Sequence, residues 1–76
     1  MRVLHSISVS LIDVDRWPFR GTLPLVRHLE AGGGVPPIHV AFAPHGRYRI
    51  LDGRHRLLAF KLLERPRISA KLGIYP

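Results

Sequence analysis

Five consecutive residues combine one carboxylate, one glycine and three cationic or ionisable side chains: Asp52-Gly53-Arg54-His55-Arg56. An apolar, β-prone run ends at this segment, and a stretch of helical character follows it to about Arg65. We therefore expect a strand, a turn and a helix in that order. Asp52 is predicted to cap the helix by accepting N–H groups of the first turn. Gly53 allows a sharp turn and a close approach of the backbone to a ligand.

The three residues after the glycine indicate the chemistry of this turn. The first N–H groups of a helix have no partner within the helix, and its positive dipole end favours an anion. Cations are normally unfavourable there. Arg54, His55 and Arg56 at that end therefore indicate a negative ligand, most simply a phosphate. The alternative is that the arginines are solvated or paired with Asp52 and Glu30, and that His55 only packs.

Composition narrows the class of protein. The chain has 76 residues, of which 46% are hydrophobic, so one compact domain over residues 1–76 is expected. A net charge of +7 and a pI near 11.4 are typical of proteins that bind nucleotides or polyanions. A coding bias that enriches arginine would give the same excess of positive charge. There is no cysteine, which excludes disulfides, thiolate metal sites and cysteine nucleophiles.

No hydrophobic run reaches the roughly 20 residues that a membrane helix requires, and the N-terminus lacks a signal-peptide pattern. We therefore expect a cytoplasmic protein that does not bind a membrane. The aspartates Asp13 and Asp15 and the histidines show no recognisable ligand spacing, so no dedicated metal site is predicted.

Hydrophobic periodicity predicts an α+β fold, a small mixed β-sheet with two main helices. Alternation predicts a first strand over Arg2 to Val14. A helix from Leu23 to Ala31 follows, with Thr22 as its N-cap and three glycines after it. Two strands, Ile38 to Ala43 and Arg47 to Leu51, are predicted to form an antiparallel hairpin. The second helix and a last strand, Arg67 to Leu72, complete the pattern.

Three segments together resemble the ParB N-terminal/sulfiredoxin superfamily, and the likeness runs from Ile7-Ser8-Val9 to Leu72. They are Val35-Pro36-Pro37-Ile38-His39-Val40, then Tyr48-Arg49-Ile50-Leu51-Asp52-Gly53-Arg54-His55-Arg56-Leu57-Leu58-Ala59, and Ile68-Ser69-Ala70-Lys71-Leu72. The resemblance implies that the strand–turn–helix holds the triphosphate of a nucleotide. Mg²⁺ would arrive with that nucleotide, because the ion binds partly through substrate phosphates.

Residue by residue, the resemblance assigns Gly53 as the glycine of close approach, and His55 and Arg56 as the phosphate-contacting pair. Arg54 stands where sulfiredoxin has its catalytic cysteine, so reduction of sulfinic acids is excluded. The first helix offers the nucleotide only Thr22, Arg27 and His28, where sulfiredoxins present lysine and small hydroxyl residues.

Three functions remain open from the sequence. The first is a nucleotide-binding module for an ATP- or CTP-type triphosphate, held at residues 52–56 and acting in DNA-related regulation or with another protein. The second is a ParB-like nuclease or a phosphotransferase, for which Asp52 and His55 are the available catalytic pair. The third is a sequence-independent DNA-binding domain. A domain this small could also form a homodimer to cover apolar surface.

Overall fold

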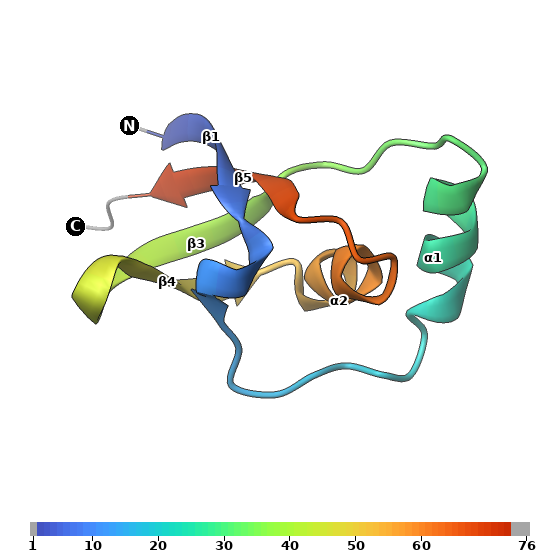
Figure 1. The fold of residues 1–76 in the computed structure, drawn as a ribbon, viewed down its shortest axis with the longest axis horizontal. Coiled ribbons are helices and arrows are strands. Elements are labelled where there is room, and N and C mark those ends of the chain that lie inside the picture. The colour runs from blue at the N-terminus through green and yellow to red at the C-terminus, as the bar shows by residue number, and fades with distance from the viewer. Residues whose placement is uncertain (1, 74–76) are drawn as a thin grey trace.

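The computed structural model describes residues 2–73, which form one five-stranded mixed sheet with two helices (Figure 1). The strands are β1 (Arg2–Ser8), β2 (Ile12–Asp13), β3 (Ile38–Ala43), β4 (Arg47–Asp52) and β5 (Arg67–Gly73), and their order in the sheet is β1-β5-β3-β4-β2. The β1–β5 and β3–β4 pairs are antiparallel, whereas β3–β5 and β2–β4 are parallel. The predicted α+β class is confirmed.

The single first strand predicted over residues 2–14 is wrong, because the chain changes from one edge of the sheet to the other. β1 ends at Ser8, and the 3-10 turn η1 (Val9–Leu11) carries the chain to β2 beside β4. The turn also shifts the alternation by one residue. Ile12 is consequently buried at 6% exposure, while Leu11 is 37% exposed.

The β3–β4 hairpin forms as predicted. Its turn, η2 (Pro44–Gly46), places both His45 and Gly46 at positive φ, 64° and 72°. β4 runs one residue beyond the predicted Leu51 and delivers the chain directly to the turn at Gly53.

One helix packs directly on the sheet, and the other packs on the first helix. α2 (Arg54–Leu62) contacts β3, β5 and η1, and α1 (Leu23–Glu30) packs on α2 (Figure 1). The stripe predicted for α1 is confirmed, since Leu29 is 2% exposed and Leu25 and Val26 are half-buried. Neither helix, nor any other helix in the described part of the chain, is long and apolar enough to span a membrane.

α2 ends earlier than the predicted Arg65. Glu64 takes a positive φ of 56°, and the N–H of Arg65 donates to the carbonyl of Phe60 at 2.9 Å. This left-handed C-terminal turn satisfies carbonyls at the end of the helix and stops it after Leu62.

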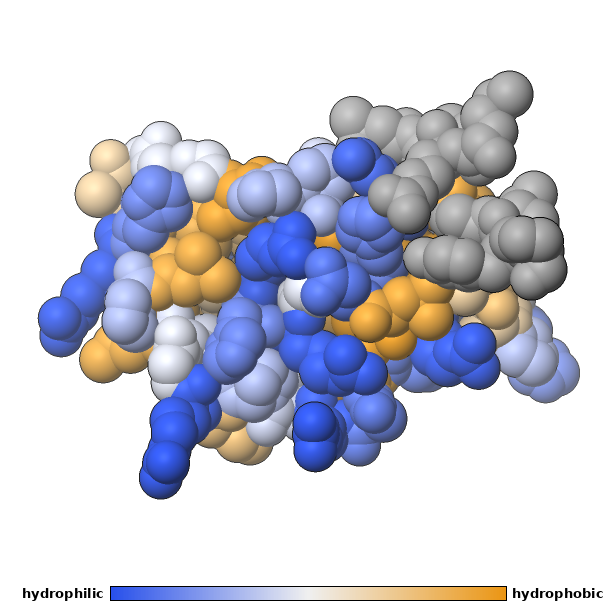
Figure 2. Space-filling view, turned by 180° about the vertical axis from the view of Figure 1, so that it is seen from behind, coloured by the Kyte–Doolittle hydropathy of each residue, from blue (hydrophilic) through white to orange (hydrophobic). Residues whose placement is uncertain are grey.

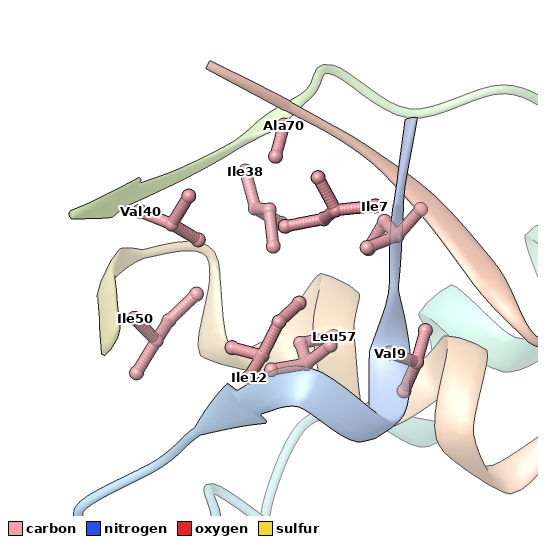
Figure 3. Packing of buried hydrophobic residues seen from close by; sticks show 9 residues of the cluster. Ile7, Val9, Ile12, Ile38, Val40, Ile50, Leu57 and Ala70 are labelled. Carbon is pink, nitrogen blue, oxygen red and sulfur yellow. The ribbon is translucent and has the colours of Figure 1, made fainter. Parts of the chain in front are cut away.

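The core lies between the sheet and α2. Side chains from the segment β1-η1-β2, from β3 and β4 and from α2 converge there (Figure 3). Ile38, Val40 and Leu57 have no exposed surface. Leu57 lies one turn after the start of α2, so its burial fixes the N-terminus of α2 against the strands that precede it.

Candidate anion-binding site

The start of α2 is held tightly against the core. Gly53 is the N-cap residue with φ +103°, and a Cβ at this position would lie 2.6 Å from Cγ2 of Ile38. Only glycine fits this backbone without displacing a buried side chain. The glycine predicted for close approach therefore has a structural requirement of its own.

Asp52 does not cap the helix, which corrects the sequence prediction. No side chain caps α2, and the Asp52 carboxylate instead accepts a hydrogen bond from Nη2 of Arg56 at 3.1 Å. The left-handed turn at Gly53 makes Gly53, and not Asp52, the residue that precedes the helix. The intrahelical ladder begins with the N–H of Leu57 and the carbonyl of Gly53, at 2.9 Å. The N–H groups of Arg54, His55 and Arg56 precede it in the first turn.

A hollow of about 320 Å³ lies at this end of the helix. Its lining residues are Arg16, Pro18, Asp52, Gly53, Arg54, His55 and Arg56. The structure thus brings all five predicted residues to one concave surface. Arg16 and Pro18 join them from the segment between β2 and α1. Sequence reasoning missed these two, because no local spacing connects them to residues more than 30 positions away.

Arg56 is partly committed to the fold. Its Nη1 donates to the carbonyl oxygens of Pro37 at 2.7 Å and Pro36 at 3.2 Å, and its side chain is only 20% exposed. The guanidinium thus ties the start of α2 to the segment that leads into β3. Arg56 therefore stabilises the turn and also contributes positive charge beside the hollow.

Arg54 is more available than Arg56. Its Nε donates to Oδ1 of Asp15 at 2.9 Å, and this hydrogen bond lowers the pKa of Asp15. The same contact raises the pKa of Arg54. The pair joins the segment after β2 to the first turn of α2 and leaves the remaining guanidinium donors of Arg54 beside the hollow.

His55 is oriented by the N-terminus of α1. Nδ1 of His55 lies 3.0 Å from Oγ1 of Thr22, and that hydroxyl donates to the carbonyl of Pro18 at 2.6 Å. Thr22 uses its one proton on Pro18, so His55 must donate from Nδ1 to Oγ1. Nε2 of the neutral ring is then the acceptor nitrogen. Thr22 stands at the predicted N-cap position, but its hydroxyl does not cap α1.

The other polar residues considered from the sequence lie elsewhere. Arg27 and His28 are exposed on α1, where His28 contacts the carbonyl of Gly34 at 2.7 Å. Asp13 pairs with Arg47 at 2.7 Å, away from Asp15 and its partner Arg54. Within residues 2–73, no three His, Asp or Glu side chains gather as metal ligands would.

The site as a whole is a cationic hollow suited to a phosphate group. Three arginines and a histidine line it, and the first-turn amides of α2 add unpaired donors. Asp52 is the one carboxylate of the lining, and it already pairs with Arg56.

No protein-family model matches the chain, and no curated protein sequence matches it. Several solved structures do match the chain. Sulfiredoxin from Arabidopsis thaliana superposes with a TM-score of 0.77 at 22% identity, over 96% of this chain and 86% of that one. The chromosome-partitioning protein ParB from Caulobacter crescentus, complexed with CTP-γ-S, gives a TM-score of 0.80 at 18% identity over 97% of this chain. A free serine kinase in complex with AMP gives 0.84 at 19% identity over 95% of this chain.

The chain spans 46% of that ParB chain and 31% of the kinase chain, so it corresponds to only a part of each. The likeness covers all of the sheet and both helices, which are the elements that position the hollow. The residues that carried the resemblance in the sequence lie on β3, β4, α2 and β5 of this common framework. The chain therefore has the ParB/sulfiredoxin-like fold.

Proposed function

We propose that this chain is a binding module for a nucleoside triphosphate of the ATP or CTP type, with the phosphates held at residues 52–56. One observation carries the proposal: the first turn of α2 has no acidic residue and presents Arg54, His55 and Arg56 around a hollow. Charge of this sign opposes the helix dipole unless an anion is bound there. The CTP-γ-S-bound ParB and the AMP-bound kinase show that chains of this fold accommodate nucleotides.

Within this proposal the lining residues divide into two groups. Gly53 and Arg56 set the shape of the turn, because one lies against Ile38 and the other holds the carbonyl of Pro37. Arg54 and Arg16 supply guanidinium donors that suit phosphate oxygens. His55 adds a donor from Nε2 when its ring is protonated.

The donor set also fits a nucleotide that carries Mg²⁺. Such an ion is usually held by phosphates together with one or two carboxylates. Asp52 is the one carboxylate that lines the hollow. It is the side chain that would face the ion, and the arginines would neutralise the remaining phosphate charge.

The test is calorimetric titration of ATP and CTP with Mg²⁺ into the chain and into Arg54→Ala. We expect the substitution to weaken binding about tenfold or more, because charge-assisted hydrogen bonds contribute about 1.5 to 3 kcal/mol. Arg49→Ala is the matched control, since it removes the same charge from an exposed position of β4 outside the hollow.

Arg56→Ala is a useful second variant, interpreted with its stability measured in parallel. It should weaken nucleotide binding and also lower the free energy of unfolding, because it releases the carbonyls of Pro36 and Pro37. Binding that is equally strong in Arg54→Ala and the native chain would contradict the proposed site. No heat at millimolar nucleotide would contradict nucleotide binding altogether.

A further inference from the structure

The sheet has a second face that neither helix covers within residues 2–73. Buried side chains of β3 and β5, such as Ile38, Val40 and Ala70, point toward α2. Because side chains alternate along a strand, the intervening residues lie on the opposite, open face. Cross-strand partners share a face except at the β-bulge between His39 and Val40, where Asp52 is opposite His39 but lies at the hollow beside Arg56. The register therefore assigns these residues to the open face: Ser6, Ser8, Asp13, His39, Ala41, Ala43, Arg47, Arg49, Arg67, Ser69 and Lys71.

The charge on this open face is almost entirely positive. It carries Arg47, Arg49, Arg67 and Lys71 from three strands, against a single carboxylate, Asp13. Asp13 is engaged by Arg47 in a bidentate contact of 2.7 to 3.1 Å. Within residues 2–73, Arg49 and Lys71 take part in no ion pair.

The other four carboxylates lie on the helical side of the molecule. Asp15 and Asp52 pair with arginines of α2, Glu30 is the last residue of α1, and Glu64 follows α2. The net charge of +7 is therefore not spread evenly, and the open face is a defined cationic surface. An anionic partner would meet little electrostatic repulsion there.

Cations lie on both sides of the central strand of this face. Arg49 of β4 lies beside Ala41 of β3, and Lys71 of β5 lies beside His39 of β3. β4 and β5 are two strand spacings apart, or about 10 Å. An extended polyanion that crosses β3 would therefore meet a cation on each side.

Toward the β1–β5 edge, hydroxyl donors join the cations. Ser6, Ser69 and Arg67 also border a hollow of about 290 Å³ that extends to Leu29 and Phe60 on the helical side, so this hollow is not part of the open face itself. Nε of Arg67 donates to Oγ of Ser6 at 3.1 Å, which orients the guanidinium along this edge. Seen from behind, the part of the surface that is not drawn grey shows hydrophilic side chains between separate hydrophobic patches (Figure 2).

We propose that the open face of the sheet binds the phosphodiester backbone of nucleic acid, without reading its sequence. Arg49 and Lys71 contact phosphates on the two sides of β3, and Arg67, Ser6 and Ser69 extend the contact toward β1. Phosphate contacts position a nucleic acid and carry no base information. This surface is separate from the hollow at α2, so the proposal does not rest on nucleotide binding.

The experiment measures fluorescence anisotropy of a labelled 20-base-pair DNA duplex of arbitrary sequence, titrated with protein between 50 and 200 mM NaCl. The variant Arg49→Ala/Lys71→Ala removes two charges from the open face. The control Arg20→Ala/Arg27→Ala removes two charges from exposed positions at and before α1. Arg49→Gln/Lys71→Gln is the second face variant, and all four proteins are checked for native circular dichroism.

For the face variants, we expect the slope of log K against log salt to become shallower by about 1.8, because each phosphate contact contributes about 0.9. Affinity should fall roughly tenfold, and the control should bind like the native chain. Equal losses in the face variants and the control would overturn the proposal, because binding would then depend on net charge alone. Absence of DNA binding at 50 mM salt would also overturn the proposal, whether or not the protein binds phosphatidylserine vesicles.

Discussion

At Gly53 the backbone has a φ of +103°, and an added Cβ would lie 2.6 Å from the buried Cγ2 of Ile38 and 3.2 Å from Cζ of Arg56. One residue therefore determines the path of the chain, the packing of β3 and the position of a guanidinium. The sequence located this glycine correctly through its position between a strand and a helix. It could not show that the capping role belongs to Gly53 itself, because that depends on the left-handed conformation.

Gly53→Ala is expected to lower the free energy of unfolding by about 2 to 5 kcal/mol. The left-handed backbone accounts for roughly 1 to 2 kcal/mol and the clash with Ile38 for about 1 to 3 kcal/mol. Urea denaturation measures the loss. Gly32→Ala is the control, because Gly32 also has a positive φ of 88° but a Cβ there meets nothing within 4 Å. Equal losses at the two positions would show that the contact with Ile38 does not matter.

A substitution at Thr22 provides a second test of the site, because its side chain is only 2% exposed and contacts His55. Thr22→Val removes the hydroxyl that joins Pro18 and His55 and should destabilise the chain by about 1 to 3 kcal/mol. It should also shift the tautomer populations of His55, which ¹⁵N chemical shifts of the ring report directly. Thr22→Ser keeps the hydroxyl and should keep the native tautomer. Unchanged ring shifts in Thr22→Val would exclude the orienting role.

At the scale of elements, the segment between β2 and α1 is joined to α2 by the ion pair of Asp15 and Arg54. The sequence predicted α1 and α2 but neither β2 as a separate strand nor this contact, because an irregular segment has no periodicity from which to infer its path. The same limit applies to η1. Its turn moves the chain across the sheet, and alternation alone predicted one unbroken strand.

The ion pair predicts a defined pH dependence. Because the hydrogen bond from Arg54 lowers the pKa of Asp15 from 3.8, the stabilisation is present above that value. It is lost as pH falls through the lowered pKa of the folded state. The free energies of unfolding of the native chain and Asp15→Asn should therefore differ slightly near neutral pH and converge in acid. A difference that persists at a pH where Asp15 is fully protonated would show that the pair is not its source.

At the scale of the whole molecule, the sequence predicted the fold class and most strand boundaries but not the order β1-β5-β3-β4-β2. Periodicity records which face of a strand is buried, whereas the choice of neighbour depends on contacts between distant residues. The β1–β5 pairing joins Arg2 to Gly73 and Ser8 to Arg67. Only the family resemblance carried information of that range.

This pairing also predicts that the chain tolerates circular permutation. The start of β1 and the end of β5 lie side by side at one edge of the molecule (Figure 1). A short linker between them, with new ends opened at the exposed turn Pro44–Gly46, should give a permutant with a native circular dichroism spectrum. A permutant that remains unfolded would mean that the β3–β4 hairpin must be continuous for the sheet to form.

The same adjacency governs the order in which the native chain can fold. Of the five strands, β1 is synthesised before the others and its partner β5 after them, and β5 is also the parallel neighbour of β3. Two of the four strand pairings, β1–β5 and β3–β5, therefore wait for β5, and β1 and one edge of β3 stay unpaired until then. In the permutant β5 and β1 become a local hairpin while β3 and β4 become distant in sequence, so the two changes in contact order oppose each other. In the native chain, the unpaired edges of β1 and β3 favour aggregation until β5 has been made.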